Sequence, residues 1–489
     1  MEMKLINKIF LLLGIWLLVI GQVYCSDIVK QPNVAGTFYP ADKNELSKAI
    51  DSYLAGYKVI GGEGDLVGII VPHAGYEFSG KVAGYAYKQL TNKSFDTVII
   101  IGPSHYASFD GISVIPSGEY ATPLGNVKID NEMASQIMSF NSKISYVKEA
   151  FEKEHSVEVQ IPYLQKTLKN FKIVPVVMGY QTLENSNILA QAIVKAVTSH
   201  APGKNPKKVL IVASTDMSHY HTAEVAGTMD AVAIADISKG DVSALATHLA
   251  SGECELCGYG TVITLMLAGD QLGANSYEIL KYADTGDVTG DKSSVVGYMS
   301  AGVYRRPVKL DDTDKSHLLD IARKTLESFI YTKTKPDFTV YEKELQQKSG
   351  VFVTLNENGK LRGCIGYLRP YRPLYLAVSD MARAAATQDM RFTAVTTEEL
   401  PNIQIEISVL SPMTEITSTS EVEIGKDGIL IVNGDQSGVF LPQVATENHW
   451  TREQFLENVC GKAGLPVSAL KDPNTRLYIF TAEVFREEE

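Results

Sequence analysis

The stretch Val67-Gly-Ile-Ile-Val71, followed directly by Pro72-His-Ala-Gly-Tyr76, decides the fold of this chain. A short apolar run rich in β-branched residues, closed by a turn, is typical of a strand buried on both faces of a sheet. Comparable runs bounded by glycine, proline or serine occur at Thr97–Ile101, Ile173–Val177 and Val209–Ala213. We therefore predict four buried strands in the first part of the chain.

Amphipathic segments separate these strands, at Ser79–Leu90, Asn187–Ser199 and Ala223–Ser238. Strands that alternate with helices predict a layered α/β sheet whose middle strands run parallel. We assign this α/β layered domain to residues 28–305.

A change of pattern divides the 489-residue chain. Tyr304-Arg-Arg-Pro307 leads into a polar stretch, and residues 306–314 are the predicted linker. In residues 315–489, a helix at Ser316–Ile330 precedes a predicted hairpin and the alternating strand Ile403–Val409. This second domain is predicted to be α+β with mostly antiparallel strands.

The composition limits the classes of function. Hydrophobic residues make up 45% of the chain and charged residues 21%, as is usual for globular domains. The formal net charge of −12 and the lack of basic clusters argue against nucleic acid as a partner.

The first 25 residues have the pattern of a signal peptide. Lys4 and Lys8 precede an uncharged apolar run, Ile9–Ile20, which is shorter than the ~20 residues that cross a bilayer. Cleavage after Cys25 is favoured, while lipidation of Cys25 or an uncleaved membrane anchor stays open. Each alternative predicts an exported protein, periplasmic or in the cell envelope, that meets the membrane only through this segment.

Histidines follow three of the predicted strands. His73 comes after the first strand, His105 after Thr97–Ile101, and Asp216 and His219 after Val209–Ala213. Because the carboxyl ends of parallel strands meet at one edge of a sheet, these side chains should lie close together. Imidazoles from several segments, with a carboxylate or thiolate, form the ligand set of Fe, Zn, Cu and similar divalent metals. A single such histidine would more often be structural, but three at equivalent positions favour a metal site.

Two further candidates lie outside the strand ends. His155 and Glu158 are three residues apart in a segment with helical spacing, which suits a ligand pair, an acid/base pair, an orienting contact or a salt bridge at a helix start. Cys257 precedes an apolar helical segment, where a thiolate is favoured as a metal ligand or nucleophile, although a buried inert cysteine is the alternative. Cys254 and Cys257 could also form a thiol–disulfide switch, but the thioredoxin-like context is missing.

These segments together resemble the Memo family, also called AmmeMemoRadiSam system protein B. The resemblance covers about residues 30–305 and rests on Val34-Ala-Gly-Thr-Phe-Tyr-Pro40, Val71-Pro-His-Ala-Gly-Tyr76, Gly102-Pro-Ser-His105, Glu154-His-Ser-Val-Glu158, the turn from Asp216 to His219, Cys257-Gly258 and Gly286-Asp-Val-Thr-Gly290.

The resemblance implies a fold similar to that of class III extradiol dioxygenases, which hold non-haem Fe(II) with two histidines and a glutamate. In Memo proteins two histidines and a cysteine take these places, which implies His73, His105 and Cys257 as metal ligands here. It also implies His219 as an acid/base, with Asp216 and His155 in the same pocket.

The second domain resembles the AMMECR1 family, AmmeMemoRadiSam system protein A, over about residues 315–485. The matching motifs are Leu361-Arg-Gly-Cys-Ile-Gly366, Gln388-Asp-Met-Arg-Phe392 and Ile405-Glu-Ile-Ser-Val-Leu-Ser411. The resemblance implies a surface groove with Arg362, Cys364, Asp389 and Arg391, although Cys364 in a strand favours packing over chemistry. It also implies a radical SAM protein as a partner in a shared pathway.

Two hypotheses on function follow. In the first, Fe(II), or else Cu or Zn, binds at His73, His105 and Cys257; with Fe or Cu the protein is an oxidoreductase acting on a small-molecule or peptide substrate. His219 would move protons, Asp216 would orient it, and His155 would hydrogen-bond a bound oxygen species. In the second, the protein is a non-catalytic binding or scaffold protein whose pocket recognises a peptide or a modified substrate.

Overall fold

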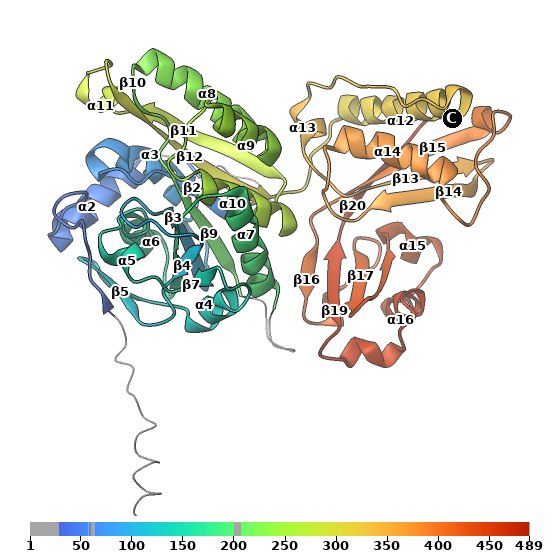
Figure 1. Ribbon diagram of the computed structural model, residues 1–489. Coiled ribbons are helices and arrows are strands. Elements are labelled where there is room, and N and C mark those ends of the chain that lie inside the picture. The colour runs from blue at the N-terminus through green and yellow to red at the C-terminus, as the bar shows by residue number, and fades with distance from the viewer. Residues whose placement is uncertain (1–28, 57, 60–63, 200–206, 489) are drawn as a thin grey trace, which may run out of the picture.

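The computed structural model describes residues 29–56, 58–59, 64–199 and 207–488. The predicted signal peptide, residues 1–25, lies outside this range. The described chain forms two parts that lie beside each other, one coloured blue to yellow and the other gold to red (Figure 1). None of the helices in the described residues is long and apolar enough to cross a membrane.

The centre of the first part is a sheet whose four middle strands run parallel, as predicted. These strands have almost no exposed residues, because other elements cover both faces of the sheet. In spatial order they are β2 (Asp65–Val71), β9 (Val209–Ser214), β3 (Thr97–Pro103) and β8 (Lys172–Met178).

Antiparallel strands extend this sheet at both edges, so the sheet is mixed. Strand β12 (Val295–Arg305) pairs with β2 on one side, and β4 (Ile112–Val114) pairs with β8 on the other. The remaining strands are β10 (His219–His221) and β11 (Ser276–Asp284), which pair with β12, and β7 (Ile144–Ser145), which pairs with β4. A separate small sheet contains β1 (Val29–Lys30), β5 (Glu119–Thr122) and β6 (Gly125–Lys128).

Helices lie on both sides of the main sheet (Figure 1). On one side α3 packs against β2 and β12, and on the other α10 packs against β2, β3 and β9. The helices are α2 (Lys43–Leu54), α3 (Tyr76–Lys88), α4 (Asn131–Met138), α5 (Glu149–Glu152), α6 (Ile161–Thr167), α7 (Leu183–Thr198), α8 (Ala223–Lys239), α9 (Val242–Ser251), α10 (Tyr259–Gln271) and α11 (Gly286–Thr289), with a 3₁₀ turn, η1 (Glu158–Gln160).

The second part begins with an antiparallel sheet, as the sequence predicts. Its strand order is β14 (Lys360–Tyr367), β13 (Val351–Glu357), β15 (Ile403–Leu410) and β20 (Ala482–Arg486). The helix α14 (Leu374–Thr387) packs on this sheet and against α12 (Asp312–Thr332), and α13 (Lys343–Gln346) packs beside α14.

A second antiparallel sheet in this part has its own hydrophobic core, which the sequence did not lead us to predict. Its strand order is β16 (Thr414–Ile416), β19 (Arg476–Phe480), β17 (Gly428–Asn433) and β18 (Gln436–Phe440). The helices α15 (Pro442–Glu447) and α16 (Arg452–Lys462) lie beside it. The connections of this part contain the 3₁₀ turns η2 (Leu400–Asn402), η3 (Thr419–Glu421) and η4 (Val467–Lys471).

Candidate metal centre

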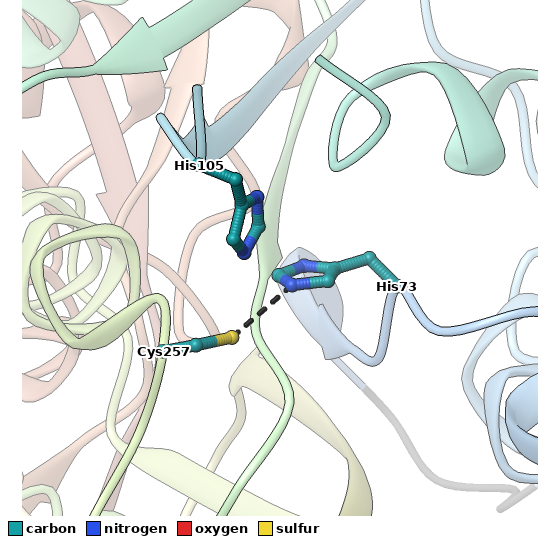
Figure 2. A group of neighbouring side chains, drawn as sticks. All are labelled: His73, His105 and Cys257. Carbon is teal, nitrogen blue, oxygen red and sulfur yellow. Dashed lines mark hydrogen bonds between the residues drawn. The ribbon is translucent and has the colours of Figure 1, made fainter. Parts of the chain in front are cut away.

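Two histidines and a cysteine from three separate segments meet at the carboxyl edge of the main sheet. His73 follows β2, His105 follows β3, and Cys257 lies just before α10. Each offers a ligand atom, and these atoms lie within 4.8 Å of one another. The side chains point toward a common centre, and the His73 Nε2 and Cys257 Sγ atoms are 3.1 Å apart (Figure 2). The predicted meeting of strand-end histidines is thus found in the structure.

The hydrogen bonds around His73 fix which of its ring nitrogens is free. The Ser214 hydroxyl donates to the Ser156 carbonyl oxygen at 2.7 Å and accepts from Gln160 Nε2 at 2.9 Å. Its only hydrogen is therefore used, so the 2.9 Å contact with His73 Nδ1 requires that Nδ1 donates. A neutral His73 then has its lone pair on Nε2, which faces Cys257.

Glu154 orients His105 in the same way. Its carboxylate accepts hydrogen bonds from the His105 backbone amide at 2.6 Å and from His105 Nδ1 at 2.9 Å. It also accepts from the amides of His155 and Ser156. Burial alone would raise the pKa of Glu154, but the bonds from His105 and the amides lower it to about 2. Glu154 is thus a fixed anion that leaves His105 Nε2 free to bind a metal.

A glycine allows this carboxylate to come close to the end of β3. A Cβ atom on Gly102 would lie 2.2 Å from Ser156 Oγ, which is far inside van der Waals contact. The Ser156 hydroxyl also donates to the Pro103 carbonyl oxygen at 2.9 Å. The segment that carries Glu154 therefore packs directly on the strand that ends at His105.

The position of Cys257 depends on a second close approach. A Cβ atom on Gly258 would lie 2.3 Å from the Ser214 carbonyl oxygen, so the start of α10 packs against the end of β9. The Asp216 amide donates to Cys257 Sγ at 3.1 Å. Burial, and then the nearby Asp216 carboxylate, raise the pKa of the Cys257 thiol well above its ordinary value. Without a metal Cys257 is a thiol, whose hydrogen is directed to His73 Nε2.

Asp216 is buried beside these ligands. Its Oδ1 atom accepts a hydrogen bond from the His73 amide at 2.8 Å, and its Oδ2 atom lies 3.8 Å from His73 Nε2. Burial raises the pKa of Asp216 to about 6, although the bond from the His73 amide acts in the opposite direction. Asp216 therefore both braces the loop of His73 and can hold a proton near neutral pH.

His155 lies against the two ligand histidines. Its ring stacks on that of His105 with centroids 4.7 Å apart, and Phe38 packs on it at 4.6 Å. Burial lowers the pKa of His155 to about 4 despite the Glu154 carboxylate 3.4 Å from its Nδ1 atom. His155 is therefore neutral at pH 7.

The proposed pairing of His155 with Glu158 is wrong. Glu158 accepts hydrogen bonds from the amides of Asn33 and Val34 and from the Tyr39 hydroxyl, at 2.6, 2.9 and 2.7 Å. It fixes the N-terminal segment to the domain and lies in none of the candidate ligand groups of the described chain. The carboxylate that contacts the histidines is Glu154, to which the sequence analysis gave no role.

His219 lies on the open side of the centre. Its Nδ1 atom donates to the Met217 carbonyl oxygen at 2.7 Å, which leaves Nε2 as an acceptor. The neighbouring Glu255 accepts from His221 Nε2 at 3.2 Å and from the His219 amide at 3.4 Å. Tyr220 between the two histidines has a positive φ of 61° and a highly exposed side chain. Such a backbone conformation is costly for tyrosine and persists only where the surrounding structure fixes it.

Cys254 does not form a disulfide with Cys257 in the structure, where both thiols are free. Its side chain is buried in the hydrophobic core, and burial raises its pKa to about 11. Such an environment makes the Cys254 thiol inert. It does not favour a thiol–disulfide switch between Cys254 and Cys257.

A pocket of about 530 Å³ opens next to His219 and Cys257. Its other lining residues are Gln181, Thr182, Leu183, Met217, Ala246, Leu249, Ala250, Cys254, Glu255, Leu256, Tyr259 and Ile263.

In the second part of the chain, the four residues suggested for a groove do not share one environment. Arg362 is buried and binds Glu399 and the Thr393 carbonyl oxygen, so it is a structural residue rather than a groove residue. Asp389 accepts from the Cys364 amide and from the Arg391 guanidinium, which lowers its pKa to about 2. Cys364, Asp389 and Arg391 thus form one connected group.

The donor atoms allow three overlapping ligand groups, which are His73/His105/Cys257, His105/Glu154/His155 and Asp216/His219/Cys257. Glu154 already accepts four hydrogen bonds, so it is a poor ligand in the second group. In the first group both histidines are held through Nδ1, so that their Nε2 atoms carry no hydrogen in the neutral rings. Metal-binding histidines are usually held in this way. Two imidazoles and one thiolate suit Fe, Cu or Zn.

Comparisons with known proteins identify both parts of the chain. Residues 30–302 match the family model described as Memo-like protein, and residues 319–485 match the model described as AMMECR1. The chain belongs to the Memo-like protein family and carries an AMMECR1 domain behind the Memo-like one.

Two MEMO1 family relatives support the assignment to the Memo-like family. A MEMO1 family protein of Methanobrevibacter smithii is 40% identical over 288 residues, which are 57% of this chain and 100% of the relative. A MEMO1 family protein of Nitrosopumilus maritimus is 38% identical, over 55% of this chain and 98% of the relative. The crystal structure of an uncharacterized protein from Pyrococcus horikoshii is 39% identical, covers 35% of this chain and 90% of that one, and has a TM-score of 0.34.

Proposed function

We propose that the Memo-like domain is a metal-dependent oxidoreductase, with Fe(II) or Cu bound by His73, His105 and Cys257. The observation that carries the proposal is that hydrogen bonds fix the tautomer of both imidazoles. Ser214 holds His73 through Nδ1 and Glu154 holds His105 through Nδ1, so that both rings present Nε2 toward the sulfur. A structural role for the histidines would not need this arrangement of tautomers.

When bound, a redox-active metal supplies the electron transfer that side chains cannot provide. The side chains of the protein hold the metal and the substrate in position and accept or donate protons. His219 Nε2 is an acceptor beside the centre and can take a proton from a substrate in the adjacent pocket. Asp216, whose pKa is raised to about 6 by burial, can hold a proton next to His73. His155, which is neutral and buried, packs against His105 at the side of the metal centre.

The resemblance of the Memo-like motifs to the Memo family implies a relation to class III extradiol dioxygenases, and this relation favours oxidative chemistry. The same resemblance implies that the Cys257 thiolate takes the place of their carboxylate ligand, and a thiolate changes the electronic properties of a metal. The proposal therefore does not include ring cleavage.

The test is the metal content of protein purified without oxygen. We expect about one Fe or Cu per chain in the wild type, and its loss in His73→Ala, His105→Ala and Cys257→Ser. His317→Ala is the matched control, because His317 pairs with Glu342 on the other domain. Equal metal content in all variants would refute the site.

Activity requires a separate measurement. The loaded protein should consume O2 in the presence of a reductant and a substrate from extracts, and the three ligand variants should not. Full metal loading with no redox change of the metal under any of these conditions would favour the binding-protein hypothesis.

A further inference from the structure

We propose that Asp230, on α8, is a positioning residue of the centre, which fixes the ring tautomer of His219. It does so through the peptide group between Met217 and Ser218. The inference rests on the proposed function, in which His219 takes a proton from the substrate through Nε2. Asp230 belongs to none of the candidate ligand groups of the described chain, so its role is distinct from that of a metal ligand.

A single peptide group joins the carboxyl group of Asp230 to the imidazole of His219. The Ser218 N–H donates to Asp230 Oδ1 at 3.0 Å. The Met217 C=O, which belongs to the same peptide group, accepts from His219 Nδ1 at 2.7 Å. Because a peptide group is planar, a rotation of this group would break both hydrogen bonds at once. Asp230 therefore holds the carbonyl oxygen where it requires the hydrogen of His219 on Nδ1, which leaves Nε2 as an acceptor.

The neighbouring strand cannot do this in place of Asp230. The Gly297 carbonyl oxygen on β12 accepts from the Met217 amide at 2.9 Å, and the Gly297 amide donates to the Ser218 carbonyl oxygen at 3.0 Å. These bonds hold the peptide groups before and after the one that joins Met217 to Ser218. The orientation of the middle peptide group is thus left to Asp230. A Cβ atom on Gly297 would lie 2.0 Å from Asp230 Oδ2, so glycine is needed for this approach.

Asp230 is a costly residue for the interior of the domain. Its side chain is fully buried, and no lysine or arginine among the residues that the structure describes forms an ion pair with it. Tyr282 donates to Asp230 Oδ2 at 2.7 Å. Burial raises the pKa of Asp230, while the hydrogen bonds from Tyr282 and Ser218 act in the opposite direction. An apolar side chain would avoid the desolvation of a carboxyl group, so packing of α8 does not explain this aspartate.

The hydrogen bonds of this chain also strengthen one another. An acceptor on the Ser218 N–H polarises the peptide group, which makes the Met217 carbonyl oxygen a better acceptor for His219 Nδ1. Carboxylates often orient histidines by direct contact, as Glu154 does for His105. Asp230 acts on His219 in the same sense, with one peptide group in between.

The tautomer of His219 tests the inference in the full chain. We label the histidines with ¹⁵N, assign the His219 signals with His219→Gln, and read the ratio of the Nδ1–H form to the Nε2–H form from the ring shifts. We expect the Nδ1–H form to predominate in the wild type. In Asp230→Leu the ratio should fall about tenfold, because the peptide group is no longer held. A wild-type His219 with its hydrogen on Nε2, or an unchanged ratio in Asp230→Leu, overturns the inference.

Matched variants separate the tautomer from a general loss of stability. Asp236→Leu removes another buried aspartate from α8, one that binds His248 at 2.6 Å, and should leave the ratio unchanged. Asp230→Asn keeps an acceptor for the Ser218 amide and should stay within about twofold of the wild-type ratio. If Asp236→Leu or Asp230→Asn lowers the ratio as much as Asp230→Leu does, the inference is wrong.

A milder variant decides the question if Asp230→Leu does not fold. Tyr282→Phe removes the donor to Asp230 Oδ2 and keeps the ring, so the carboxyl group is held less firmly. The ratio should then fall about two- to threefold. A wild-type ratio in Tyr282→Phe would contradict the inference.

The two proposals fail in different ways. The tautomer is read without turnover, both in metal-free protein and in protein loaded with Zn(II), which is diamagnetic. A tautomer that depends on Asp230 in a protein that takes up neither Fe nor Cu would refute only the proposed function. Full metal loading with a tautomer that does not respond to Asp230→Leu would refute only the positioning role.

Discussion

Glu154 shows how much of the centre depends on one side chain that does not itself face the metal site. Its carboxylate holds the His105 ring, the His105 amide and the turn that carries His155. The removal of such a partner usually costs metal-binding proteins 10- to 100-fold in affinity, by order of magnitude.

We therefore expect Glu154→Gln to bind metal about 10- to 100-fold more weakly than the wild type while the fold is kept. A glutamine can donate to or accept from His105 Nδ1, so the tautomer is no longer fixed. Competition with a chelator measures the affinity. The control is Glu152→Gln, a half-exposed glutamate near Lys148 in the same segment. A wild-type affinity for Glu154→Gln would show that ring orientation does not depend on this carboxylate.

The pH dependence of stability follows from the buried imidazoles. Burial lowers the pKa of His155 from 6.5 to about 4 and that of His73 well below 6.5. Between pH 4 and 6.5 these histidines bind more protons in the unfolded chain than in the native one, so the free energy of unfolding rises with pH. Asp216 acts in the opposite sense, because its pKa is raised to about 6.

Metal-free protein should thus gain stability from pH 4 to 6.5, and His155→Phe should reduce that gain by about 3 kcal/mol, by order of magnitude. Asp216→Asn should make the rise steeper. Urea unfolding across this pH range provides the values. A rise that is the same in wild type and His155→Phe would mean that His155 is protonated in the native state.

At the scale of elements, the buried strands were predictable, because such strands have a clear apolar pattern. The edge of the sheet at which the functional side chains meet was also predictable, because the carboxyl ends of parallel strands share one edge. The hairpin of β13 and β14 was predictable for the same reason. The second sheet of the C-terminal part was not predicted, since its strands are short and half exposed, which weakens their pattern.

Within the site, the strand-end histidines were predictable and the turn of residues 154–158 was not. Helical spacing suggested that His155 and Glu158 share a face, but the helical turn starts only at Glu158. Both glutamates are buried, and which of them contacts the histidines depends on close packing at Gly102 and on the N-terminal segment. Neither feature is visible in local spacing.

The junction of β9 and α10 gives a prediction at this scale. Gly258→Ala places a methyl group 2.3 Å from the Ser214 carbonyl oxygen, so the start of α10 and Cys257 must move. We expect at least a tenfold loss of metal affinity. Gly227→Ala in α8 is the control, because nothing lies within 4 Å of its added methyl group. Metal titrations of both variants decide the matter, and equal affinities would contradict the packing argument.

At the scale of the molecule, the residues that the structure describes form three separate hydrophobic cores. The first spans Val34–Tyr304, the second Val308–Val409 and the third Ile416–Leu477. The described contacts between the Memo-like and AMMECR1 parts include Lys348 with Asp270 at 2.7 Å and with Asn275 at 3.0 Å. Polar contacts of this kind at a surface contribute little free energy.

A fragment of residues 28–308 should therefore fold by itself and bind metal with the stoichiometry of the full chain. Metal analysis and circular dichroism test this, and the complementary fragment 309–489 is the control that should bind none at this centre. An unfolded first fragment would show that the AMMECR1 domain is part of the same folding unit.

The ligand atoms of the centre come from distant places in the chain, with His73 and Cys257 separated by 184 positions. A ribosome has to deliver almost the whole domain before these atoms can meet, so no early stretch of the growing chain can take up the ion. A chain that crosses a membrane unfolded would reach the far side empty. Which ion it then receives is decided by the supply in that compartment rather than by the supply where the chain was made.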